Sequence, residues 1–292
     1  MGDSLQFLIT GLTIGSIYAI VALGFVTIYS VTKVINLAQG EFVMLGGMTM
    51  FTLLKTGMSY FIAFLLTVVI VVAIGWLLEL TIIRKAKGAD ALSLIILTIG
   101  CAIFIRGIAG MVWGKDSVKV ASFTKDEPLQ FLGASITPQS IWVMIFMLLI
   151  VVGLYVLMEK TMLGKAFRAC SVNPLAARLM SISPKKMSSF SFALSAGLGA
   201  LAGLVIAPIM FPSYDMGIML GIKGFSASIL GGLGSAPGAV FGGLLLGVIE
   251  SLGAGYISSG MKDAIAFGFV LMILLIRPYG LLGEKNVGKG GL

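Results

Sequence analysis

Few residues of this chain could do chemistry, and none of them forms a known catalytic group. The 292-residue sequence contains no histidine, so no imidazole can act as a base, a proton relay or a metal ligand. It also lacks a GxxxxGK[ST] phosphate loop, a GxSxG nucleophile elbow and an HExxH zinc motif. Cys101 lies in an apolar stretch and Cys170 in a basic one, so we interpret both as packing residues. We therefore expect no enzymatic activity, metal or cofactor in this chain.

The other chemically distinctive residues are charges inside or beside long apolar segments. An ionisable side chain within a bilayer costs roughly 2.5–3.5 kcal/mol to insert, so each one needs a reason. These residues are Glu41, Glu79, Arg106, Glu250, Lys262 and Asp263. We interpret Glu79 as a partner of Arg84 near one membrane surface. We interpret Arg106, Lys262 and Asp263 as interfacial anchors that reach toward water.

Two acids and two amides are harder to explain in this way. The sequence VINLAQGEF contains a polar cluster of Asn36, Gln39 and Glu41. Glu250 lies near the end of another apolar segment, where it could face outer water. One interpretation is a helix start with Asn36 as its cap and Glu41 in its first turns. The alternative is a bent, functional segment. These four residues are pathway sites or structural polar sites.

A basic loop at 159–187 is the third distinctive feature of the sequence. Asn173 can cap a helix whose first position is Pro174, and the apolar residues that follow predict one apolar face about two turns long. A helix of two turns is not stable alone in water, so something must hold it. The loop contains one anion, Glu159, and six cations: Lys160, Lys165, Arg168, Arg178, Lys185 and Lys186.

Composition determines the class of protein that positions these residues. The chain is 58% hydrophobic and 11% charged, with a mean hydropathy of +1.09, whereas soluble domains have about 25% charged residues. Uncharged runs such as 4–32 and 187–214 exceed the length that crosses a bilayer as helix. The sequence predicts an all-α, polytopic transmembrane bundle of eight or nine spans. We place these at 5–31, 38–54, 60–82, 91–112, 139–158, 188–209, 216–233, 238–254 and 258–276.

The second, seventh and eighth of these segments could be re-entrant or broken helices, which are tolerated where protein or a water-filled cavity covers them. Glycine pairs spaced by four, such as Gly11/Gly15 and Gly243/Gly247, predict close helix crossings. We expect one transmembrane domain over 1–292, with an ordered external loop at 113–139 that contains a short helix. The tail at 284–292 is expected to be disordered.

The distribution of cations predicts the orientation. One side collects thirteen Lys and Arg residues, including the loop at 159–187, and the other side collects four. By the positive-inside rule the N-terminus is outside and the C-terminus is cytoplasmic. This distribution explains the net charge of +8 without a nucleic-acid partner.

Several segments together resemble one family. The stretches at 11–42 (including INLAQGEF), 223–251 (KGFSASILGGLGSAPGAVFGGLLLGVIES), 262–283 and 163–183 are similar to branched-chain amino acid ABC transporter permeases of the LivH type. The resemblance runs nearly end to end. It departs at Ser181, where many relatives have Gly, and at Gln39, where some have His. With serine at 181 we expect a less sharply defined helix end, with Ser183-Pro184 as the stop.

The resemblance implies an importer subunit in a bacterial inner membrane that works by alternating access. It implies four kinds of partner: a second permease subunit (paralogous or identical), two cytoplasmic ATPases, an external binding protein and membrane lipid. The short helix would dock into an ATPase through Leu175, Ala176, Leu179 and Met180, flanked by Arg168 and Arg178. A permease for urea, short amides or other neutral amino acids is the nearest alternative. An ion-coupled secondary transporter that uses Glu41 or Glu250 is the alternative from another class.

Overall fold

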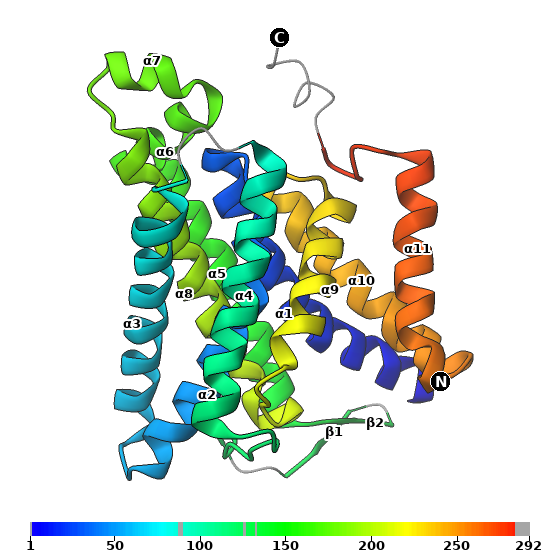
Figure 1. The fold of residues 1–292 in the computed structure, drawn as a ribbon. Coiled ribbons are helices and arrows are strands. Elements are labelled where there is room, and N and C mark those ends of the chain that lie inside the picture. The colour runs from blue at the N-terminus through cyan, green and yellow to red at the C-terminus, as the bar shows by residue number, and fades with distance from the viewer. Residues whose placement is uncertain (1, 87–89, 125–126, 132, 284–292) are drawn as a thin grey trace.

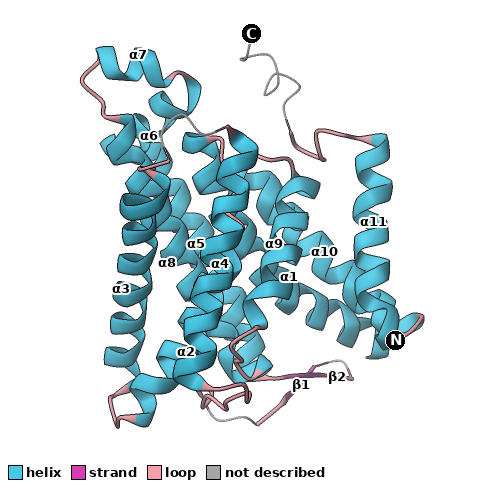
Figure 2. Cartoon of the chain, in the orientation of Figure 1, coloured by secondary structure: helices cyan, strands magenta, loops and turns pink. Residues whose placement is uncertain are grey.

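The computed structural model describes residues 2–86, 90–124, 127–131 and 133–283. The described chain is a bundle of helices with one small β-hairpin (Figures 1 and 2), which confirms the predicted all-α membrane architecture. The tail expected to be disordered lies outside the described residues.

Seven helices of the described chain are long and apolar enough to cross a membrane. They are α1 (Gly2–Thr32), α3 (Tyr60–Leu78, extended by the π-helical turn Glu79–Ile83), α4 (Ala91–Trp113), α5 (Pro138–Lys160), α8 (Pro184–Met210), α10 (Ala236–Tyr256) and α11 (Lys262–Ile276, preceded by the 3-10 turn Ser259–Met261). Two apolar helices are shorter, α2 (Gln39–Lys55) and α9 (Met216–Gly231). They match two of the three segments that the sequence marks as broken or re-entrant.

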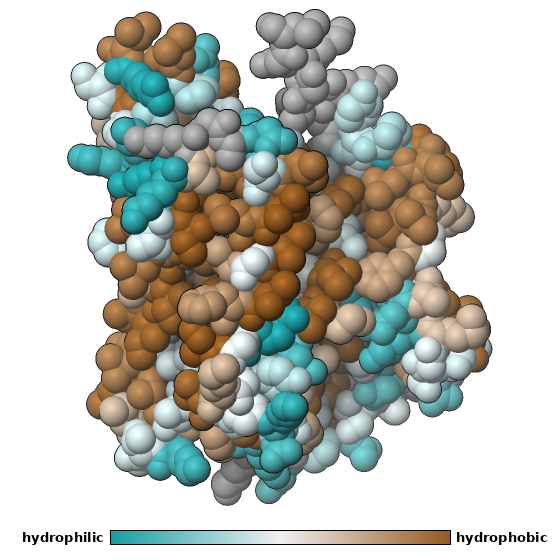
Figure 3. Space-filling model, viewed as in Figure 1, coloured by the Kyte–Doolittle hydropathy of each residue, from teal (hydrophilic) through white to brown (hydrophobic). Residues whose placement is uncertain are grey.

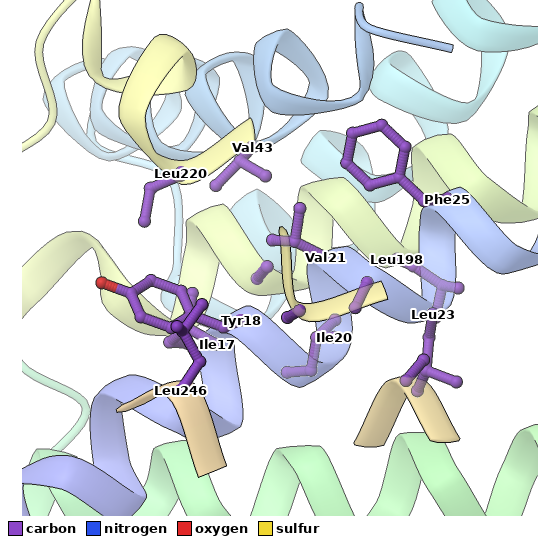
Figure 4. Close-up of a cluster of buried hydrophobic side chains, with 14 of the residues drawn as sticks. Ile17, Tyr18, Ile20, Val21, Leu23, Phe25, Val43, Leu198, Leu220 and Leu246 are labelled. Carbon is purple, nitrogen blue, oxygen red and sulfur yellow. The ribbon is translucent and has the colours of Figure 1, made fainter. Parts of the chain in front are cut away.

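The centre of the bundle is α1, which packs along α10 and also contacts α8 and α9. Figure 4 shows Ile17, Ile20 and Val21 of α1 in the same buried cluster as Leu198 of α8 and Leu246 of α10. The helices α3, α4, α5 and α11 lie at the periphery, and most of their apolar residues face outward.

Glycine makes the central crossing of α1 and α10 possible. A Cβ atom at Gly247 would lie 2.3 Å from the Cα atom of Gly15, and one at Gly11 would lie 2.7 Å from the Cα atom of Val248. No side chain fits at such distances, so the two backbones are in direct contact. The prediction of close packing from these glycine pairs is confirmed.

In its described residues, the loop that follows α4 forms two strands and not the expected short helix. β1 (Leu129–Phe131) pairs antiparallel with β2 (Ala134–Ile136), and Gly133 between them has φ +83°. A turn with positive φ favours glycine and connects two short strands directly. The backbone N–H of Ser135 donates to Gln6 Oε1 at 2.7 Å, which ties the hairpin to the start of α1.

Candidate functional site

Two short helices, α6 (Met162–Val172) and α7 (Pro174–Leu179), form the loop at 159–187 and project from one end of the bundle (Figure 1). Thr161 Oγ1 accepts from the N–H of Gly164 at 3.1 Å, which starts α6. Asn173 Oδ1 accepts from the N–H groups of Leu175 and Ala176, both at 3.0 Å, and Pro174 occupies the first position. The predicted cap of the short helix is confirmed, while α6 itself was not predicted.

The end of α7 is sharply defined, contrary to expectation. Ser181 adopts a left-handed conformation with φ +61°, its N–H donates to Arg178 O, and the N–H of Ile182 donates to Ala177 O, both at 3.0 Å. This pair of bonds is the Schellman arrangement that normally uses glycine. Ser183-Pro184 does not stop α7, because Pro184 begins α8.

The apolar residues of α7 face away from the chain. The side chain of Ala177 is buried, whereas Leu175, Leu179 and Met180 are 67%, 83% and 77% exposed. Ala176 and Arg178 are exposed as well. Arg168, on α6, is paired with Glu159. The helix contacts α6 and α8, and among the described residues most of its apolar side chains remain exposed.

Cys170 of α6 is a packing residue, as expected from the sequence. It is buried, and burial raises the pKa of its thiol. A raised pKa leaves little thiolate at neutral pH, so the side chain is a poor nucleophile.

The polar cluster of Asn36, Gln39 and Glu41 lies where the chain passes from α1 to α2. Asn36 does not cap α2. Its Oδ1 accepts from the N–H of Ala38 at 3.2 Å, and Ala38 is the residue that precedes the helix. Gln39 Nε2 donates to the carbonyl of Ser195 at 3.1 Å, and a Cβ atom at Gly24 would collide with this amide. Gln39 therefore joins α1, α2 and α8.

Glu41 and Arg106 form an ion pair that the sequence did not predict. Glu41 Oε1 lies 2.6 Å from Nη2 and 3.2 Å from Nε of Arg106. The side chain of Glu41 is 2% exposed and that of Arg106 is 25% exposed. The interpretation of Arg106 as an interfacial anchor is wrong, because its guanidinium reaches inward from α4 to the first turn of α2.

Glu250 belongs to a second network, which connects four helices. Lys223 Nζ on α9 lies 2.6 Å from Glu250 Oε1 on α10 and 2.6 Å from Asp263 Oδ1 on α11. Tyr18 on α1 donates its hydroxyl to Glu250 Oε2 at 2.9 Å. Glu250 is buried rather than turned toward outer water, and Asp263 is paired rather than free to reach the interface. Opposite charges in three apolar segments were the only sequence signal for this network.

The remaining intramembrane acid behaves as predicted. Glu79 Oε2 lies 3.0 Å from Arg84 Nη2, and the hydroxyls of Ser188 and Ser189 donate to the same carboxylate. Across the described parts of the chain, no group of three acidic or cysteine side chains is placed to hold a metal ion. The described residues therefore offer buried charge pairs, a short helix with exposed apolar side chains, and close helix contacts.

Comparison with known proteins places this geometry in a family. The family model described as "Branched-chain amino acid transport system / permease component" matches residues 7–276. The chain is 31% identical to the high-affinity branched-chain amino acid transport system permease protein LivH of Salmonella typhimurium, over 98% of this chain and 97% of that protein. It is 33% identical to the corresponding BraD of Pseudomonas aeruginosa, with the same coverage.

A solved structure shares the fold. PsaBC from Streptococcus pneumoniae, in complex with a Fab, superposes with a TM-score of 0.53 at 15% identity, covering 94% of this chain and 92% of that one. The full-length similarity to the permeases and the helical bundle agree with each other. The chain therefore belongs to the branched-chain amino acid transport permease family, as a multi-pass membrane protein and a transport subunit.

Proposed function

We propose that this chain is the permease subunit of an ABC importer for branched-chain amino acids, driven by two ATPases, one of which binds at α7. The observation that carries the proposal is a short helix, capped at both ends, whose apolar side faces solvent. Exposed apolar residues beside cationic ones are typical of a protein interface. Since the chain has no phosphate loop, ATP hydrolysis belongs to the partner chain.

The docking residues are Leu175, Ala176, Leu179 and Met180, with Arg168 and Arg178 as charged neighbours. ATP-driven approach of the two ATPases would move α6 and α7 and, through their contacts, α5 and α8. This movement would switch the pathway between outward and inward exposure. An external binding protein would deliver the substrate at the side of the β-hairpin.

We also propose that the face formed by α4, α9 and α11 meets a second permease subunit rather than lipid. Figure 3 shows hydrophilic patches that interrupt the apolar surface on this face, one between α4 and α9 and one between α9 and α11. The partly exposed Arg106 and Asp263 come from these helices. A charge that faces hydrocarbon is costly, so a protein partner or a water-filled pathway is the favoured environment. The membrane is the inner membrane of a bacterium in this proposal.

The docking role of α7 is tested by changing its most exposed apolar residue. Leu179→Asp should leave insertion of the permease intact, because the side chain is 83% exposed. It should reduce co-purification of the ATPases and lower ATP-dependent leucine uptake at least tenfold, because a charge would enter an apolar interface. Leu179→Met, which keeps the apolar area, is the matched control and should retain uptake. Normal assembly and uptake in Leu179→Asp would refute the proposal.

A further inference from the structure

The Glu41–Arg106 pair has unused binding capacity. Glu41 Oε1 accepts two hydrogen bonds from Arg106, while Glu41 Oε2 is buried without a hydrogen-bond partner among the described residues. The guanidinium of Arg106 has five N–H donors, and these two bonds use two of them. A buried carboxylate oxygen without a partner is rare and destabilising, and in a native structure it calls for an explanation.

The free oxygen lies where two helices begin. A Cβ atom at Gly217, in the first turn of α9, would lie 2.9 Å from Glu41 Oε2 and 2.7 Å from the carbonyl oxygen of Gly40. The first turns of α2 and α9 therefore touch through glycine backbone at this point. Movement of α9 away from α2 would uncover Oε2.

The pair lies beside an apolar cluster. Ala109 of α4 and Met44 of α2 are buried in the cluster that covers this junction, and Ile105, Tyr214 and Met216 pack against the same cluster. Asp215, just before α9, is a second acid near Glu41. The junction thus combines two acids and one base with an apolar wall.

We propose that Glu41 and Arg106 bind the charged backbone of the transported amino acid, with Glu41 Oε2 receiving the α-ammonium and Arg106 the α-carboxylate. This assignment rests on the proposed function. An acid beside a base, 2.6 Å apart, is complementary to a zwitterion whose own charges are neighbours. The planar guanidinium suits a carboxylate, and the apolar wall suits an aliphatic side chain. The site is closed in this conformation and opens when α9 moves away from α2.

The test measures uptake of radiolabelled leucine by cells that carry the complete transporter, normalised to the amount of permease that co-purifies with its ATPases. Glu41→Gln and Arg106→Lys should each lower the maximal uptake rate at least tenfold. Arg106→Lys keeps a cation beside Glu41, so the fold is retained. It removes the planar guanidinium and its paired N–H donors. Glu79→Gln is the matched control, because the Glu79 carboxylate already has partners on both oxygens, and its uptake should stay within twofold of the wild type.

A purely structural ion pair gives a different pattern. The double variant Glu41→Gln/Arg106→Gln removes both charges together, so it should restore uptake if the pair only stabilises the fold and should remain inactive if the pair binds substrate. Uptake within twofold of the wild type in the double variant, or in Arg106→Lys, would overturn the inference. A wild-type transporter that carries no leucine would instead refute the proposed function, so the two failures are distinguishable.

Discussion

Lys223 lies between two carboxylates from different helices, and its position shows how one charge can connect most of the bundle. Its ammonium is 2.6 Å from Glu250 Oε1 and 2.6 Å from Asp263 Oδ1, while Tyr18 donates to the other oxygen of Glu250. Lys223 and Glu250 are both buried. Each of these groups would be expensive in the membrane without the others.

Lys223→Met should therefore destabilise the protein by about 3–5 kcal/mol, since it leaves Glu250 as a buried charge without its cation. The measurement is thermal unfolding of the detergent-purified protein. Adding Glu250→Gln to Lys223→Met should recover much of the loss, because the uncompensated buried charge is removed. Lys262→Met, one residue before Asp263 and exposed, is the control and should change stability by no more than about 0.5 kcal/mol. Equal effects of the two single variants would contradict this role for Lys223.

At the scale of single elements, α7 depends on its two ends rather than on its length. Six residues form too few internal hydrogen bonds to be stable alone, so the Asn173 cap and the bonds around Ser181 carry much of its order. Ala177 is the residue that anchors it to the rest of the chain. These features leave a capped helix whose apolar side is exposed among the described residues, as a docking element requires.

Ser181→Gly should stabilise α7 by about 1 kcal/mol, because a non-glycine residue in the left-handed region carries a steric cost of about 1–2 kcal/mol. Hydrogen–deuterium exchange of the α7 amides should slow about fivefold, the factor that corresponds to this energy. Ser183→Gly is the matched control. Ser183 has φ −86°, where glycine has no advantage, so exchange should not slow there. Equal slowing in both variants would show that the left-handed conformation at 181 is not the cause.

The short helices α2 and α9 are the other elements with a special position. Gly40 and Gly217 let their first turns touch, and Gly221 lies near Gly40 one turn later. The sequence marked both segments as candidates for re-entrant or broken helices. It gave no sign that their starts meet each other.

At the scale of the whole molecule, charge sets the direction of the chain through the membrane. The basic helices α6 and α7 lie at one end of the bundle and the β-hairpin lies at the other (Figure 1). The excess of cations predicts that the end with α6 and α7 is cytoplasmic.

Cysteine labelling in spheroplasts tests this orientation in a Cys101→Ser/Cys170→Ser background. Leu129→Cys, in the hairpin, should react with a membrane-impermeant maleimide in intact spheroplasts. Val172→Cys, at the end of α6, should react only after permeabilisation, although the side chain at this position is 85% exposed and Leu129 is 55% exposed. The opposite pattern would reverse the topology and exclude ATPase docking at α7.

The sequence by itself determined what depends on composition and on neighbouring residues. Apolar run length fixed the membrane class, and Asn173-Pro174 fixed the start of α7, because a cap bonds to amides only two or three residues away. Asn36 as a cap of α2 and Ser183-Pro184 as the stop of α7 were wrong, since neighbouring backbone geometry satisfied those helix ends instead.

Only the tertiary structure decided which charges meet. Arg106 pairs with Glu41 across 65 positions of sequence, and Lys223 brings together acids from two later helices. Helical periodicity places a residue on a face of its own helix but does not say which helix that face contacts. Inside an apolar bundle each charge needs a partner, and the packing of backbones through glycine selects which partner is within reach.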